Sequence, residues 1–300
     1  MSSIVVTGAG GYIGSVLCAR LIENDYQVVA VDVNLKALVP LCRFRSFKPV
    51  LCDISDEAVM ADLLSSCDAV VHLAAVVGSK SVDADYIAAR KTAIDGTQRL
   101  LDWSDGKLFI YPNTDAGYPN APGKLTEDTP MSGLTHYAEL KIAGEQLVLA
   151  AGGISLRLGS VFGAAPAMRH GTLLNWMVGT AVRQDRLALS QAGARRTLLH
   201  VEDAVEAIIH ALSWGYPMKG KAFNVSLPAM IKLDMCEHIK KYWPAFSWHV
   251  DQDAYSDPDW RDFDMDCTRL RDVCHWQPMH DIDLGICELI RVYKALGASL

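Results

Sequence analysis

Residues 7–14 read TGAGGYIG, and the segments on either side indicate what kind of turn this glycine-rich stretch forms. The β-branched run at residues 4–6 predicts a buried parallel strand before the turn, and the amphipathic pattern after it predicts a helix. Gly8, Gly11 and Gly14 allow a tight turn and let backbone amides approach a pyrophosphate at the positive end of that helix. A glycine cluster between a strand and a helix therefore predicts a dinucleotide site.

Strands and helices alternate along the rest of the chain. The further strands predicted from apolar runs lie at residues 27–31, 49–54, 68–75, 107–112, 154–158 and 223–225. The predicted helices lie at about 83–103, from about 135 to 151, and at 173–182, 203–212, 233–242 and 282–296. This order is typical of an α/β fold with a parallel, doubly wound sheet and right-handed crossovers.

Asp32, at the end of the second predicted strand, bears on the choice of dinucleotide. A carboxylate there accepts hydrogen bonds from the adenine ribose and repels a 2′-phosphate, which favours NAD over NADP. The alternative is a helix N-cap, and Arg43 and Arg45 weaken the preference. The residues predicted to contact the cofactor are Gly8, Gly11, Tyr12, Ile13, Gly14, Asp32, Asp53, Ile54, Leu73, Ala74, Ala75 and Lys141.

Tyr137 and Lys141 stand four residues apart in YAELK, so on a helix they share one face. A phenol has a pKa near ~10 and is a poor base at neutral pH. A fixed ammonium, or the positive ring of an oxidised nicotinamide, favours the phenolate. The pair can then take a proton from a sugar hydroxyl while hydride leaves the same carbon. The pattern alone is common on solvated helix faces, and the upstream glycine turn gives it this interpretation.

Composition excludes several other classes of protein. Half of the residues are hydrophobic, and 28 Lys and Arg against 35 Asp and Glu give a net charge of −7, which argues against nucleic-acid or membrane partners. The 8 cysteines form no Cys-x-x-Cys or zinc spacing and indicate a reducing, cytoplasmic setting. Neither a signal peptide nor a membrane span is expected. The aspartate-rich segment 251–266 lacks the pattern of a calcium loop, so no metal is expected.

Taken together, these motifs resemble the extended short-chain dehydrogenase/reductases, in particular the nucleotide-sugar epimerase/dehydratase branch. The matching stretches are TGAGGYIG (7–14), Asp32, DI (53–54), HLAA (72–75), NTDAGY (113–118), YAELK (137–141), LRLGSVFG (156–163) and RRTLLHVEDAV (195–205). The expected architecture is a Rossmann NAD-binding domain with a smaller C-terminal α/β substrate domain. We place the first at 1–163, with returning segments at about 197–226, and the second at 164–196 and 227–300.

The resemblance implies that hydride is abstracted from a sugar carbon, usually C4, by tightly held NAD. Tyr137 would be the base, while Lys141 would bind the nicotinamide ribose and lower the pKa of Tyr137. Thr114 stands where the family places the hydroxyl that bonds the reacting oxygen. Asp115 matches the aspartate of the Thr-Asp-Glu of 4,6-dehydratases, but Ala116 replaces the glutamate. Asp115 is therefore either an acid or a loop cap, and dehydration is disfavoured.

The resemblance also implies a set of substrate-binding residues. Ser160 replaces an asparagine near the ligand phosphates, Arg196 matches the phosphate arginine, and Arg261 matches a late arginine that reaches the diphosphate. Arg169 is a candidate for the substrate phosphate or sugar. Guanidinium forks match phosphate oxygens, although each arginine could instead pair with a surface carboxylate. With Thr114, these residues predict a nucleotide-diphosphate sugar as the substrate.

The leading functional hypothesis is an NAD-dependent nucleotide-sugar epimerase that oxidises a sugar hydroxyl transiently. The alternative is a nucleotide-sugar 4-dehydrogenase or a 4-keto-sugar reductase, which would use the same residues. A 4,6-dehydratase or a non-catalytic NAD-binding protein is less favoured. The family commonly pairs through the two helices that here span about 83–103 and 135–151, so a homodimer is expected.

Overall fold

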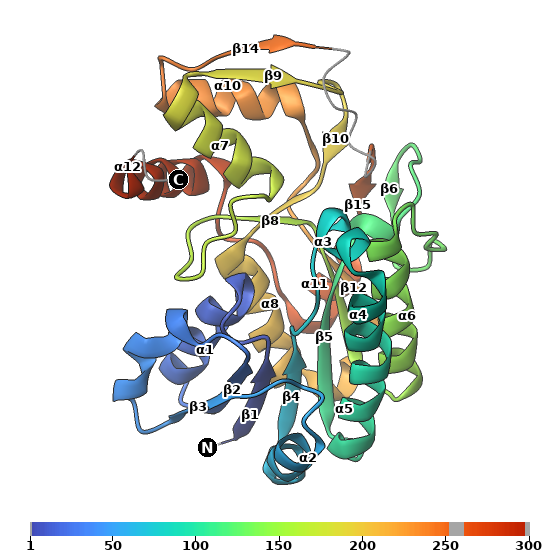
Figure 1. Cartoon of the computed structure of the whole chain (residues 1–300). Coiled ribbons are helices and arrows are strands. Elements are labelled where there is room, and N and C mark those ends of the chain that lie inside the picture. Colours follow the sequence, from blue (N-terminus) through green and yellow to red (C-terminus); the bar gives the residue numbers. More distant parts are fainter. Residues whose placement is uncertain (1, 252–260, 298–300) are drawn as a thin grey trace.

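The computed structural model describes residues 2–251 and 261–297, and its centre is a large parallel sheet (Figure 1). Within those residues the strand order of the sheet is β12-β7-β5-β4-β1-β2-β3, with every neighbouring pair parallel. Its strands are β1 (Ser3–Thr7), β2 (Gln27–Asp32), β3 (Phe47–Leu51), β4 (Ala69–His72), β5 (Leu108–Thr114), β7 (Ile154–Leu158) and β12 (Ala222–Val225). The predicted parallel α/β sheet is confirmed.

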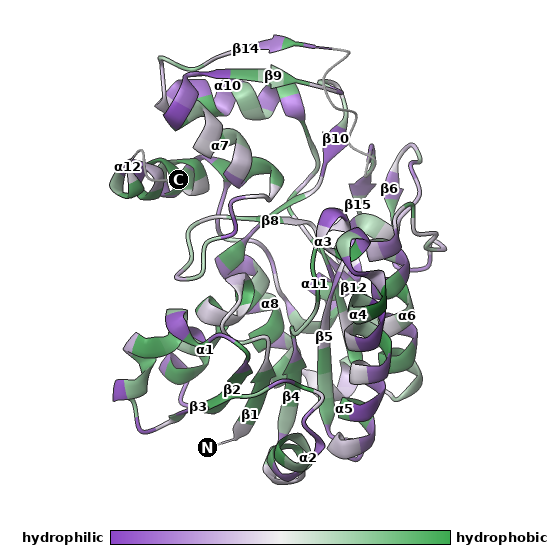
Figure 2. Cartoon of the chain, in the orientation of Figure 1, coloured by the Kyte–Doolittle hydropathy of each residue, from purple (hydrophilic) through white to green (hydrophobic). Residues whose placement is uncertain are grey.

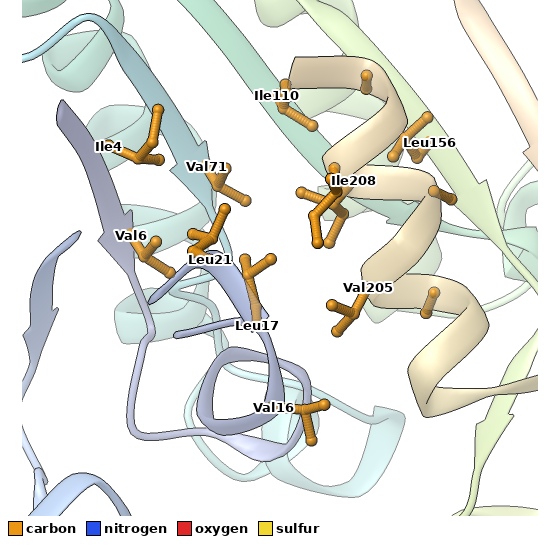
Figure 3. Packing of buried hydrophobic residues seen from close by; sticks show 14 of the residues in the cluster. Ile4, Val6, Val16, Leu17, Leu21, Val71, Ile110, Leu156, Val205 and Ile208 are labelled. Carbon is orange, nitrogen blue, oxygen red and sulfur yellow. The ribbon is translucent and has the colours of Figure 1, made fainter. Parts of the chain in front are cut away.

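Both faces of this sheet are covered by helices. Successive side chains of a strand point to opposite faces, so Ile4 and Val6 join one core while Val5 joins the other. On the first face lie α1 (Tyr12–Glu23) and α8 (Val201–Ser213), whose apolar side chains meet those of the strands (Figure 3). On the second lie α2 (Glu57–Ser66), α5 (Thr97–Ser104) and α6 (His136–Ala150). Burial on both faces explains why the strands read as continuous apolar runs.

The helix predicted at about 83–103 is present, and it begins at Tyr86. It runs without a break through α4 (Tyr86–Arg90), the π-helical turn η2 (Lys91–Gly96) and α5, and the short helix α3 (Ser79–Ala84) precedes it. The break between α3 and α4 has a local cause, because the Asp85 carboxylate accepts a hydrogen bond of 3.0 Å from the backbone N–H of Ala88. An aspartate that bonds the backbone in this way caps a new helix instead of continuing the previous one.

The strand predicted at 49–54 lies earlier, at β3. It ends at Leu51 because the Asp53 carboxylate accepts a hydrogen bond of 2.8 Å from the N–H of Ser55 and forms a turn. Pro49 is tolerated inside β3 because β3 is an edge strand, where one side of the backbone needs no partner.

A second group of helices packs beyond one end of the large sheet (Figure 1). It contains α7 (Leu173–Gln184), α10 (Lys232–Tyr242) and α12 (Ile282–Leu296), with the parallel strands β9 (Arg186–Leu189) and β14 (Ser247–Val250). These elements share a separate hydrophobic core, and Figure 2 shows hydrophilic residues on α10. The division at residue 163 stays a prediction.

The structure also contains several shorter elements. They are β8 (Ser160–Phe162) with β11 (Leu198–His200), β10 (Arg195–Arg196) with β13 (Met230–Ile231), β6 (Lys124–Leu125) with β15 (Asp264–Met265), η1 (Lys36–Arg43), η3 (Asp115–Gly117), α9 (Gly215–Met218) and α11 (Thr268–Cys274). No described helix has the length and apolarity needed to cross a bilayer. The described residues also contain no group of three or more acidic, histidine or cysteine side chains suited to a metal ion; residues 252–260 of the aspartate-rich segment lie outside them.

Candidate functional site

The glycine turn between β1 and α1 is packed too closely to admit side chains. Gly8 has a φ of +70°, and a Cβ added there would lie 2.5 Å from the backbone N of Ala74. A Cβ on Gly14 would overlap the backbone oxygen of Gly8. Gly11 begins α1 as its N-cap residue, followed by Tyr12 and Ile13. The turn therefore presents bare backbone at the N-terminal end of a helix, the geometry that accepts an anion.

Gly10 is a further residue of this turn that the spacing of Gly8, Gly11 and Gly14 did not identify. Its N–H donates a hydrogen bond of 2.9 Å to one carboxylate oxygen of Asp32, and the N–H of Asn34 donates one of 2.9 Å to the other. A Cβ on Gly10 would overlap the backbone oxygen of Asn34. The carboxylate predicted to select the cofactor is thus held in place by the turn.

Gly10→Ala is expected to disrupt this arrangement, because the added methyl group must displace the backbone at Asn34. Overpacking of this kind typically costs about 1–3 kcal/mol, so we expect lower thermal stability and at least about tenfold weaker NAD binding. Thermal unfolding and calorimetric titration with NAD measure both effects. Gly193→Ala is the matched control, since a Cβ there meets nothing within 4 Å. Equal NAD affinity in the two variants would contradict the prediction.

The other residues predicted to bind the cofactor follow neighbouring strands. Leu73, Ala74 and Ala75 come after β4, and the N–H of Ala74 donates to the hydroxyl of Thr7 at 3.4 Å. Asp53 follows β3, and its hydrogen bonds from Ser55 lower the pKa of its carboxyl. These residues meet at the carboxyl edge of the sheet, where folds of this type bind ligands.

Ile54, also predicted to bind the cofactor, is mainly a core residue. It is buried in the core between the sheet and α2, and a Cβ on Gly96 would lie 2.9 Å from its Cδ1 atom. Ile54 therefore packs against η2, and its role toward a cofactor stays a prediction.

The Thr114 side chain acts as a hydrogen-bonding group on the Tyr137 hydroxyl and lowers the pKa of Tyr137. Thr114 ends β5, while Tyr137 lies in the first turn of α6, where Thr135 is the N-cap and accepts the N–H of Ala138 at 3.2 Å. Burial raises the pKa of Tyr137, and the positive charges of Arg169 and Arg261 oppose that rise. The structure thus brings together two hydroxyls and two guanidinium groups from four separate segments.

Lys141 lies one turn after Tyr137 and is buried. Its ammonium donates a hydrogen bond of 2.8 Å to the carbonyl of Pro112 and lies 3.8 Å from the centroid of the Tyr111 ring. Burial lowers the pKa of Lys141 to about 7, although Glu145 opposes the shift. The cations that oppose the rise in the pKa of Tyr137 are Arg169 and Arg261, so the predicted influence of Lys141 on that pKa stays a prediction.

The lowered pKa of Lys141 predicts a dependence of stability on pH. The pKa is 10.5 in the unfolded chain and about 7 in the folded one, so between these values the unfolded chain binds the extra proton. The contribution of Lys141 to the free energy of unfolding therefore decreases as the pH falls from about 10 to 7. We expect Lys141→Met to gain stability relative to the natural chain over this range. Urea unfolding of both proteins at the two pH values tests this, and a constant difference would contradict it.

Asp115 forms a buried ion pair with Arg261. Its other carboxylate oxygen accepts a hydrogen bond from the hydroxyl of Thr197. Asp115 is 1% exposed and Arg261 8% exposed, so the pair is enclosed beside Thr114. The arrangement gives Asp115 a positioning role toward Arg261, while its predicted role as an acid and the predicted contact of Arg261 with a diphosphate stay predictions.

The remaining predicted substrate residues lie on segments that leave the large sheet. Ser160 is on β8, which pairs with β11, and the buried Arg196 is on β10, which pairs with β13. Arg169 precedes α7 and is half-buried, with its Nη2 atom 3.3 Å from the position that a Cβ on Gly78 would take. Of these three residues, Arg169 is the one whose charge acts on Tyr137.

The chain is similar to several known proteins. The model of the NAD dependent epimerase/dehydratase family matches residues 4–226. The uncharacterized UDP-glucose epimerase YtcB of Bacillus subtilis (strain 168) is 29% identical over 249 residues, which are 74% of this chain and 76% of that protein. A dTDP-glucose 4,6-dehydratase of Streptomyces niveus is 26% identical over 315 residues, 97% of this chain and 92% of that protein.

Solved structures share the fold over the whole chain. UDP-glucuronic acid 4-epimerase from Bacillus cereus, in complex with UDP-glucuronic acid and NAD, aligns with a TM-score of 0.86 at 22% identity and covers 98% of this chain and 99% of that one. UDP-glucose-4-epimerase from Stenotrophomonas maltophila, with bound NAD and formylated UDP-arabinopyranose, aligns with a TM-score of 0.89 at 19% identity and covers 100% of both chains.

Proposed function

The chain belongs to the NAD dependent epimerase/dehydratase family, and from this premise we propose that it is a nucleotide-sugar epimerase that transiently oxidises a sugar hydroxyl at C4. The observation that carries the proposal is the Thr114 side chain acting on the Tyr137 hydroxyl, one helical turn from the buried Lys141. These are the groups needed to hold an alcohol and remove its proton. They lie at the edge of the sheet that carries the glycine turn.

The residues of the turn fit NAD. Gly8 and Gly14 exclude side chains where a pyrophosphate must approach the backbone, and Asp32 is fixed by Gly10 and Asn34 where an adenine ribose would lie. A 2′-phosphate beside the Asp32 carboxylate would be repelled, which favours NAD over NADP. When bound, NAD accepts hydride from the sugar carbon and later returns it to the opposite face of the ring.

The side chains of the protein handle the proton. Tyr137 takes it from the sugar hydroxyl, and Thr114 hydrogen-bonds the same oxygen and orients it. Because burial raises the pKa of Tyr137, the phenolate needs compensating charge, which Arg169, Arg261 and the protonated form of Lys141 can supply. Tyr137 then returns the proton when the keto sugar has turned over.

The proposed substrate is a nucleotide-diphosphate sugar, and relatives named for UDP-linked sugars favour uridine as its nucleoside. Arg196 and Arg261 are the proposed diphosphate ligands, and Ser160 a neighbouring hydrogen-bond donor. Loss of water is disfavoured because Ala116 offers no base and Asp115 is paired with Arg261.

A panel of nucleotide-linked hexoses and uronic acids, followed by NMR with catalytic amounts of NAD, tests the proposal. A new epimer with no net change in reduced cofactor supports it. Net accumulation or consumption of reduced cofactor would overturn it in favour of a 4-dehydrogenase or a 4-keto-sugar reductase. A 6-deoxy-4-keto product would identify a dehydratase, and no turnover of any member would leave NAD binding as the only activity.

We further propose that two copies pair through α4, α5 and α6. Ile87 on α4 supports this, because it is 81% exposed although it is a large aliphatic side chain. Sedimentation velocity is expected to give the mass of a dimer for the natural chain and of a monomer for Ile87→Arg. A monomeric natural chain at micromolar concentration would contradict the proposal.

A further inference from the structure

The segment at residues 163–169 lies directly against the first turn of α1. The Tyr12 hydroxyl donates a hydrogen bond of 2.7 Å to the carbonyl of Gly163, and the N–H of Ala167 donates one of 3.3 Å to the Ser15 hydroxyl. Tyr12 and Ser15 belong to the helix that the glycine turn opens. The segment therefore adjoins the place where the pyrophosphate of a dinucleotide is expected.

A single buried amide, that of Asn175 in α7, fixes both ends of this segment. Its oxygen accepts the N–H of Gly163 at 3.1 Å, and its nitrogen donates to the carbonyl of Arg169 at 3.0 Å and to the Tyr12 hydroxyl at 3.2 Å. Asn175 is 0% exposed, so these bonds are shielded from water. The backbone of Arg169 is thus held at a set position relative to Tyr12.

The guanidinium of Arg169 reaches back from this segment toward the large sheet. It lies beside Gly78, which follows β4, and its charge acts on the hydroxyls of both Tyr12 and Tyr137, opposing the rise in pKa that burial gives each of them. Within residues 2–251 and 261–297, no carboxylate lies within the 4.0 Å of an ion pair with Arg169. A half-buried guanidinium with no carboxylate at ion-pair distance is expected to pair with a bound anion.

We propose that Arg169 pairs with the pyrophosphate of the bound dinucleotide and so closes the second group of helices over the cofactor. A dinucleotide that binds at the glycine turn and reacts beside Tyr137 must extend from the neighbourhood of Tyr12 to that of Tyr137. The charge of Arg169 acts on both of these tyrosines. The turn at residues 7–14 contains no lysine or arginine, so its own contribution is limited to backbone amides and the helix end. This inference rests on NAD as the cofactor of the proposed function and differs from the predicted contact of Arg169 with substrate.

Calorimetric titration of the full chain, freed of bound nucleotide, with NAD, ADP-ribose and adenosine tests the assignment. Arg169→Ala is expected to weaken the binding of NAD and of ADP-ribose about 10- to 100-fold, the loss expected when a hydrogen-bonded charge pair is removed. The binding of adenosine, which lacks the diphosphate, should be unchanged. Arg169→Lys should recover part of the loss. Added salt should weaken ADP-ribose binding more in the natural chain than in Arg169→Ala.

Arg291→Ala is the matched control, because it removes the same charge from an exposed position in α12. Thermal unfolding of each variant identifies any loss of fold, and Arg169→Lys keeps the assignment testable if Arg169→Ala is unstable. Unchanged affinity of folded Arg169→Ala for NAD and ADP-ribose, with weaker binding of UDP or a UDP-sugar, would overturn the proposal and make Arg169 a substrate residue. Since these are binding measurements, absence of epimerase activity would not affect them.

Discussion

Tyr137→Phe is expected to lower kcat by about 10²- to 10⁴-fold, the range typical of general acid–base catalysis. The substitution removes one oxygen, the group on which Thr114 acts, but keeps the ring that packs beside Val82 and Leu140. The fold and the glycine turn should be unaffected, so the Kd for NAD and the melting temperature should change little. Turnover of the accepted nucleotide sugar, NAD titration and thermal unfolding measure these three expected results.

Tyr216→Phe is the matched control for this prediction, because it removes the same atom from a side chain that is 92% exposed. Natural turnover in Tyr137→Phe would show that another group removes the proton. Thr114→Val extends the test, since it should lower kcat by holding the sugar oxygen less well while Tyr137 remains. A variant of Thr114 that is slower than Tyr137→Phe would place the main catalytic group at Thr114 instead.

The parts of the fold that sequence predicted are those with local causes. The turn at residues 7–14, the strand at β1 and the helix at α12 depend on glycine spacing or on apolar periodicity within a few residues, and the structure has them where the pattern placed them. The helix predicted at 83–103 begins slightly later, at Tyr86, because a side chain, Asp85, caps its first turn and separates it from α3.

The parts that sequence missed depend on contacts between distant segments. Asp115 and Arg261 were assigned separate roles, since nothing in either neighbourhood shows that the two residues meet. The glycine spacing does not identify Gly10, because a side chain there is excluded by the backbone of Asn34, which follows a different strand. The family resemblance predicts which positions belong to the site. The contacts in the structure show which of those residues interact through their charges.

Glu145 is the clearest residue that the sequence did not single out. It follows Tyr137 and Lys141 on the same face of α6 and is 3% exposed. Arg157 of β7 donates to both of its carboxylate oxygens, at 2.6 Å from Nη2 and 3.1 Å from Nε, and Asn113 and Ser155 donate at 2.7 and 2.6 Å. Burial alone would raise the pKa of Glu145, but these bonds and the charge of Arg157 lower it.

Glu145→Ala is expected to lower the free energy of unfolding by about 3–5 kcal/mol, because it leaves the guanidinium of Arg157 buried without its carboxylate. Urea unfolding measures the loss. Glu23→Ala is the control, since its ion pair with Arg20 is exposed and Arg20 keeps Glu202 as a partner; about 0–1 kcal/mol is expected there. Similar losses in the two variants would contradict a dominant role for the buried pair.

The pH dependence of the same variant separates the ion pair from simple loss of packing. The pKa of Glu145 is lower in the folded chain than its value of 4.5 when unfolded, so its contribution to stability is present above pH 4.5 and is lost as the pH falls through the folded value. The difference between the natural chain and Glu145→Ala should therefore shrink in acid, whereas a packing defect would persist. Glu145 also raises the pKa of Lys141, so a larger fraction of Lys141 should be neutral at pH 7 in the variant. The same carboxylate therefore affects both the stability of α6 and the charge of the lysine one turn from Tyr137.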